Sequence, residues 1–149
     1  MANLYNVKLT KLVEVFPLKP VFQATDYEKI CITVDDVSRP GMQLTGFFDY
    51  FEPVRLQVLG AVEMGYLRKL SSQERLIIFE HFLSYKIPAL IITRNMEPLP
   101  ECLEMDQERY RRSMVREGAA EERDLGDEGI ALRTAMDHYH ALGLEGGLI

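Results

Sequence analysis

Two short apolar runs, at residues 56–59 and 89–93, bracket a segment whose apolar residues follow a helical spacing. The second run, ALIIT, is almost continuously apolar, which is typical of a strand buried on both faces. Between the runs, Ser71 and Glu74 have the spacing of a helix-capping box, which predicts a helix that ends near residue 86. A strand, a helix and a second strand joined by short loops favour an α/β fold with a partly parallel sheet.

The segments on either side of this unit carry further signals. Residues 7–16 have apolar side chains at mostly helical spacing, which predicts a first helix that Pro17 ends. Residues 18–22 predict a short extended piece, and residues 29–34 (KICITV) predict a strand rich in β-branched side chains. Residues 63–70 predict one or two helical turns. We therefore expect a layered α/β domain whose sheet is flanked by helices.

The distribution of charge changes near residue 100. Residues 1–100 carry 11 acidic and 11 basic side chains, whereas residues 101–149 carry 12 acidic and 6 basic side chains and so account for the whole net charge of −6. We predict one domain in residues 1–100 and a charged, mostly helical C-terminal tail in residues 101–149. Within that tail, residues 101–116 and 130–142 have the composition or spacing of helices.

Composition argues against several classes of function. A net charge of −6 does not provide the basic face that nucleic acid requires, so we expect no nucleic-acid partner. The longest apolar run, residues 87–92, is too short to cross a bilayer, and the N-terminus lacks the apolar core of a signal peptide. We therefore expect a cytoplasmic protein without membrane contact. Cys31 and Cys102 fit reduced thiols, and no cysteine or histidine spacing predicts a metal site.

The sequence contains no recognisable catalytic constellation. Gly60 and Gly65 have the spacing of a phosphate-binding loop after a predicted strand, but Tyr66 and Leu67 stand where that loop needs lysine and a hydroxyl residue. We interpret this run as a plain turn from a strand into a helix. His81 lies inside an amphipathic helix, where a packed or surface histidine is commoner than a catalytic one. We therefore predict no catalytic residue.

Residues 38–60 combine turn residues with arginine and aromatic side chains. Pro40 and Gly41 predict a turn in which the glycine takes a conformation that other residues resist. Gly46 likewise predicts an unusual backbone or a close approach. Arg39 offers a planar fork of donors that fits a carboxylate or a phosphate.

Two interpretations of this segment remain open. In the first, its aromatic side chains cover one end of the sheet, and Asp49 or Glu52 pairs with Arg55. In the second, the segment forms a shallow pocket at a strand end, where α/β sheets usually bind ligands. The candidate site residues, for a ligand or for a structural turn, are Ser38, Arg39, Gly41, Gln43, Asp49, Tyr50 and Arg55. The wall of such a pocket, or else part of the core, comprises Phe47, Phe48, Tyr50 and Phe51.

The same segment carries a family resemblance. Residues 36–51 read D-x-S-R-P-G-x-x-L-T-G-F-F-D-Y-F, residues 55–67 read R-x-Q-V-L-G-x-x-E-x-x-Y-L, and an ITR triplet follows at residues 92–94. Over residues 30–104 the chain resembles the N-terminal domain of HPr kinase/phosphorylase, a bacterial regulator of carbon metabolism.

The resemblance implies an α/β domain related in fold to the uridine-binding N-terminal domains of the Mur ligases. It further implies that full-length members are hexamers that use ATP or pyrophosphate, with Mg²⁺, to phosphorylate a serine of the phosphocarrier HPr in carbon catabolite regulation. The same enzymes remove that phosphate by phosphorolysis. In the family this chemistry belongs to a C-terminal domain with a phosphate-binding loop, which residues 1–149 do not contain. We therefore expect no kinase activity and no cofactor for this chain alone.

Three functions follow as alternatives. The chain is a non-catalytic regulatory or assembly domain, a stand-alone sensor that binds a nucleotide-like or phosphorylated small molecule through Arg39, or an accessory subunit that pairs with a full-length kinase through its tail. The expected partners are proteins, through self-association or through kinase subunits, with a phosphorylated small molecule as the alternative ligand.

Overall fold

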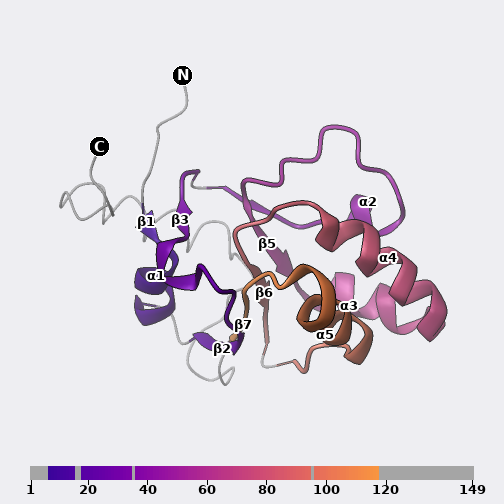
Figure 1. Ribbon diagram of the computed structural model, residues 1–149. Coiled ribbons are helices and arrows are strands. Elements are labelled where there is room, and N and C mark those ends of the chain that lie inside the picture. The colour runs from indigo at the N-terminus through magenta and orange to yellow at the C-terminus, as the bar shows by residue number, and fades with distance from the viewer. Residues whose placement is uncertain (1–6, 16–17, 35, 95, 118–149) are drawn as a thin grey trace.

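The computed structural model describes residues 7–15, 18–34, 36–94 and 96–117 (Figure 1). It confirms an α/β fold with a five-stranded mixed sheet flanked by helices. The strand order is β2 (Leu18–Phe22), β7 (Met114–Glu117), β6 (Leu90–Ile92), β5 (Leu56–Leu59) and β4 (Val37–Ser38). The last four strands are parallel to one another, and β2 is antiparallel to β7. The predicted partly parallel sheet is therefore correct.

A small N-terminal unit precedes β2 and also contributes to the domain. It consists of β1 (Val7–Lys8), α1 (Leu9–Val15), the 3₁₀ turn η1 (Tyr27–Lys29) and β3 (Cys31–Ile32). β1 and β3 form an antiparallel pair in which Val7 lies opposite Ile32. The predicted first helix is thus confirmed from residue 9. The strand predicted over residues 29–34 shrinks to two residues, because η1 occupies its start.

The central strands are buried on both faces, and their side chains alternate between two cores. Val58, Ile91 and Val115 point to the core under α1, β1 and β3. Leu59, Ile92 and Met114 point to the opposite core, under the helices that follow β4. Figure 1 shows these two groups of elements on opposite sides of the sheet. This double burial explains why the strand segments lack polar alternation.

The helices of the second layer are α2 (Gly41–Leu44), α3 (Ala61–Arg68), α4 (Ser72–Ser84), α5 (Pro100–Met105) and the π-helical turn η2 (Asp106–Tyr110). Among them, α3 and α4 begin and end close to the positions that the sequence indicates, whereas α2 lies where the sequence predicts only a turn. The predicted capping box of α4 is confirmed, because Ser71 Oγ accepts the Glu74 N–H at 3.1 Å and Glu74 Oε1 accepts the Ser71 N–H at 2.8 Å. Among the residues that the structure describes, no helix is both long enough and apolar enough to cross a membrane.

The sheet continues past residue 100, where the sequence predicts a domain boundary. β7 lies between β2 and β6 and hydrogen-bonds to both. The helix predicted over residues 101–116 is present in α5 and η2, but it is wrong at its end, where residues 114–116 belong to β7. The other predicted tail helix, residues 130–142, lies outside the described residues.

Candidate functional site

Arg39, Gly60 and Thr93 directly follow three neighbouring parallel strands, β4, β5 and β6, and therefore share the carboxyl edge of the sheet. This is the edge at which open α/β sheets usually bind ligands. Here a side chain from α3 occupies it. Oε1 of the buried Glu63 accepts a hydrogen bond from Arg39 Nη2 at 2.8 Å and another from the Gly60 N–H at 2.7 Å. Arg39 is thus engaged with a carboxylate of its own chain.

Gly60 makes this arrangement sterically feasible. A Cβ at position 60 would lie 2.3 Å from Arg39 Nη2 and 3.1 Å from its Cζ, so only glycine lets the guanidinium lie so close to the backbone. Gly60 leads directly from β5 into α3, which confirms the predicted turn from a strand into a helix. By accepting the Gly60 N–H, the Glu63 carboxylate satisfies the N-cap donor at the start of α3.

The aromatic side chains of residues 47–51 divide into two groups. Phe48 stacks on Tyr85 with ring centroids 5.0 Å apart, and Phe51 meets the edge of the same ring at 5.1 Å. These two phenylalanines pack against the C-terminal half of α4 and join the second core. The structure thus places them on a helix, whereas the first interpretation expects the aromatic side chains to cover one end of the sheet. Phe47 and Tyr50 instead project outward, with 45% and 95% of their surface exposed.

The glycines of the segment behave differently from each other. Gly46 has φ +103, which confirms the unusual backbone predicted there. The same prediction for Gly41 is wrong, because Gly41 begins α2 without a positive φ. Tyr50, which carried no such prediction, has φ +66.

Arg55 lies at the opposite edge of the sheet from Arg39, because it precedes β5 whereas Arg39 follows the parallel strand β4. Its Nε is 2.6 Å from Glu52 Oε1, which confirms that predicted pair, and its Nη2 is 4.0 Å from Asp36 Oδ2. The seven candidate residues therefore do not form one cluster. Ser38 and Arg39 lie at the carboxyl edge, Gly41 and Gln43 in α2, Asp49 and Tyr50 in an exposed loop, and Arg55 at the amino edge. Their role in binding a ligand stays a prediction.

A groove of about 320 Å³ lies between α2, α3 and α4. Its lining includes Gln43, Phe48, Tyr66, Ile77 and His81. Tyr66 and Ile77 are 39% and 65% exposed. We refer to this feature as the helical groove. The sequence gives no signal for it, since its walls come from three separate elements.

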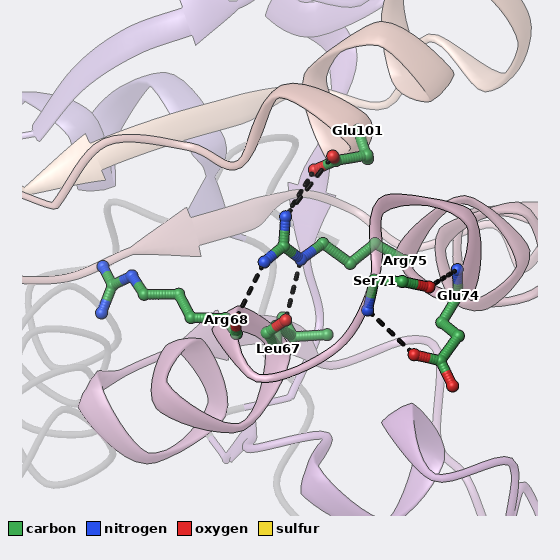
Figure 2. A network of polar contacts seen from close by, with 6 residues as sticks. All are labelled: Leu67, Arg68, Ser71, Glu74, Arg75 and Glu101. Atoms are coloured by element: carbon green, nitrogen blue, oxygen red, sulfur yellow. Dashed lines mark hydrogen bonds and ion pairs between the residues drawn. The ribbon is translucent and has the colours of Figure 1, made fainter.

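Arg75 joins three helices through one guanidinium group (Figure 2). Its Nε and Nη2 donate to the carbonyl oxygens of Leu67 and Arg68, the last residues of α3, at 2.8 and 3.0 Å. Its Nη1 lies 3.4 Å from both carboxylate oxygens of Glu101, in the first turn of α5. Hydrogen bonding from Ser72, with smaller contributions from Arg75, lowers the pKa of Glu101. These contacts were not predictable by spacing, because Glu101 is 26 residues from Arg75.

Asp106 is a fully buried carboxylate at the junction of α5 and η2. Its Oδ1 accepts the Arg112 N–H at 2.6 Å, while Oδ2 has no hydrogen-bond partner among the described residues. Burial raises the pKa of Asp106 from its usual 3.8 to about 6. The same part of the chain contains no group of three side chains that could hold a metal ion.

We expect Asp106→Asn to stabilise the protein in a pH-dependent way. Because the pKa is raised in the folded state, the unfolded chain releases this proton first and stability falls as the pH rises from about 4 to about 6. Between pH 4 and pH 7 the parent should lose about 2 kcal/mol of unfolding free energy relative to the variant. Urea unfolding at several pH values measures this difference, with Asp49→Asn at an exposed carboxylate as the control. A difference that does not change with pH would contradict the prediction.

Comparison with known proteins matches most of the described chain to one family. The family model for the HPr Serine kinase N terminus matches residues 7–117, which include every strand of the sheet. The HPr kinase/phosphorylase of Lachnoclostridium phytofermentans is 42% identical over 94 residues, which is 63% of this chain and 30% of that protein. The enzymes of the same name from Alkaliphilus metalliredigens and Streptococcus thermophilus are 44% and 34% identical, over 58% and 68% of this chain and 28% and 33% of theirs.

The chain therefore spans about a third of the length of the curated relatives that it matches. A solved structure also shares the fold. It contains the CBS and DRTGG domains of the regulatory region of Clostridium perfringens pyrophosphatase, in complex with the activator diadenosine tetraphosphate. The TM-score is 0.55 at 12% identity, over 85% of this chain and 46% of that chain. At this identity the likeness concerns the fold alone.

Proposed function

This chain belongs to the family of HPr serine kinase N-terminal domains, and from that premise we propose that it acts as a non-catalytic assembly or regulatory domain of an HPr kinase/phosphorylase system. The catalytic work of that system, the phosphorylation and dephosphorylation of a serine in HPr, falls in this proposal to a different polypeptide segment. The partners are then other protein subunits in the cytoplasm, whether further copies of this chain or kinase subunits.

The observation that carries this proposal is the helical groove. Tyr66 and Ile77 line it and are exposed, and Met42 and Phe47, adjacent in sequence to residues of the groove wall, are 61% and 45% exposed. Exposed apolar side chains gathered around a concave surface are typical of protein–protein contact sites. Scattered single apolar residues would not carry the same weight.

The arrangement at Arg39 argues against the alternative of a sensor that binds a phosphorylated molecule there. Arg39 already donates to Glu63, and the negative charge of that carboxylate opposes the entry of an anion. The third alternative, pairing with a full-length kinase, depends on the tail of residues 101–149, and most of that tail, residues 118–149, lies outside the described part of the chain.

We expect Ile77→Ser to weaken assembly at least about tenfold while the free energy of unfolding changes by less than about 0.5 kcal/mol, because the side chain is exposed. Sedimentation velocity on the chain alone, and on mixtures with the full-length Streptococcus thermophilus relative, measures the assembly. Val62→Ser is the matched control, since Val62 is 76% exposed on α3 but does not line the groove.

Two outcomes would contradict the proposal. If the parent chain sediments as a monomer and does not join the relative, it has no role in assembly. If the purified chain alone transfers phosphate from ATP or pyrophosphate to HPr, it is not a non-catalytic domain.

A further inference from the structure

A second cavity, of about 280 Å³, lies at the amino edge of the sheet, on the opposite edge from Arg39. Its walls come from the segments that precede β5, β6 and β7 and from the region around β3. Ile30, Val54 and Ile87 give the lining an apolar part. We call this feature the amino-edge cavity. Its volume falls near the lower end of the range of small-molecule sites.

Three basic residues line the cavity. Lys86 lies in the loop between α4 and β6, and Arg111 and Arg112 lie in the loop between η2 and β7. None of these side chains forms an ion pair with a carboxylate in the part of the chain that the structure describes. Asp26 is the acidic residue of the lining. A chain with a net charge of −6 therefore gathers an excess of positive charge at one concave surface.

The two arginines are held in place by uncharged groups. Arg112 donates from Nε to the Leu83 carbonyl at 3.1 Å and from Nη2 to the Ser84 carbonyl at 3.3 Å, at the C-terminal end of α4. The guanidinium of Arg111 lies 4.9 Å from the centre of the Phe22 ring, and its Nη1 donates to the Gln107 carbonyl. These contacts fix the position of both groups but leave further N–H donors on each.

The backbone conformation of Arg111 and the buried Asp106 carboxylate both help to position the loop between η2 and β7. Arg111 has φ 57 and ψ 43, the left-handed region, which non-glycine residues adopt at a cost and which here places consecutive arginines beside the cavity. The Asp106 carboxylate accepts the Arg112 backbone N–H and so holds this loop, and its charge also interacts with the two arginines.

We infer that the amino-edge cavity binds a small organic phosphate. The phosphoryl group lies beside Lys86, Arg111 and Arg112, whose forked and point-like cations are the usual protein donors to phosphate. The organic body, of the size of one ring, packs on the apolar part of the lining, which comprises Ile30, Val54 and Ile87. This site is separate from the helical groove and does not depend on the assembly function proposed above.

Phenyl phosphate and inorganic phosphate are the probes for this site. We expect both to raise the melting temperature of the full chain, with phenyl phosphate effective at lower concentration because its ring also buries apolar surface. In amide spectra the perturbed signals should be those of residues 111–113 and 30–33. Signals of Gly60 and Glu63, at the other edge, should not move.

Lys86→Ala should raise the dissociation constant for phenyl phosphate about tenfold, the effect expected from the loss of one charged donor. Lys69→Ala is the matched control, because Lys69 is also an exposed lysine just after a helix but does not line the cavity. Arg111→Gly removes the guanidinium, and glycine tolerates the positive φ at this position. This variant therefore tests the contribution of a second basic residue to phenyl phosphate binding in a chain that still folds.

Several results would overturn the inference. They are the absence of any response to phenyl phosphate, an equal response in Lys86→Ala and in the parent, or perturbed signals around Gly60 instead of residues 111–113. Benzoate carries a carboxylate in place of the phosphate. If benzoate bound as tightly as phenyl phosphate, the assignment of the site to phosphates would be wrong.

Discussion

A chain that ends at Pro100 is expected not to fold. This truncation removes β7, which lies inside the sheet and joins β2 to β6. Met114 and Val115 are fully buried on opposite faces, and their loss opens both cores at once. Each such side chain contributes about 1.5–3 kcal/mol, and the hydrogen bonds to two strands are lost in addition. The total is comparable with the whole net stability of a domain, which is about 5–15 kcal/mol.

Far-UV circular dichroism and urea unfolding distinguish a folded from an unfolded truncated chain. A chain that ends at Glu117 is the control, because it retains the five strands of the sheet that the structure describes and should unfold cooperatively. If the chain of residues 1–100 also showed a cooperative transition, β7 would be dispensable and the boundary predicted from charge would hold.

Arg75→Ala is expected to lower the free energy of unfolding by about 3 kcal/mol, since it removes several charged hydrogen bonds at once. The carbonyl groups of Leu67 and Arg68 at the end of α3 lose their donor, and the buried Glu101 loses its positive partner. The side chains of Arg75 and Glu101 are only 18% and 11% exposed, so water compensates for little of this loss.

Urea unfolding at neutral pH measures this change, and two further variants make the test specific. Arg68→Ala removes an exposed guanidinium but leaves the Arg68 carbonyl that Arg75 binds, so its effect should stay within about 0.5 kcal/mol. Arg75→Lys keeps the charge but lacks the planar fork, so it should fall between the other two. Equal stability of Arg75→Ala and Arg68→Ala would show that the junction contributes nothing.

Local patterns predicted those parts of the fold whose signal lies within a few residues. The capping box of α4 needs only Ser71 and Glu74, and β5 is bounded as its apolar run suggests. β7 could not be recognised in this way. Its two apolar residues stand among charged helix formers, and its identity as a strand comes from pairing with β2, whose Leu18 lies opposite Glu117. Tertiary pairing here overrides local helix propensity.

The same distinction between local and distant contacts applies to the candidate site. The Glu52–Arg55 pair was predictable because three residues separate its members. The Arg39–Glu63 pair joins residues 24 positions apart and depends on β4, β5 and α3 being adjacent. The amino-edge cavity depends on loops from distant parts of the chain, so no local sequence pattern could predict it.

The outer strands of the sheet restrict how this domain can associate. Among the described strands of the five-stranded sheet, β2 and β4 are the two outermost, each with a neighbouring strand on one side. β4 is only two residues long. β2 carries exposed Lys19 and Pro20 and an irregular register after Pro20. Proline offers no N–H to an incoming strand, and a charged lysine opposes its approach. The five-stranded sheet is therefore poorly suited to grow by edge-to-edge addition or to seed fibrous aggregates, which agrees with the proposed contact through a helix surface.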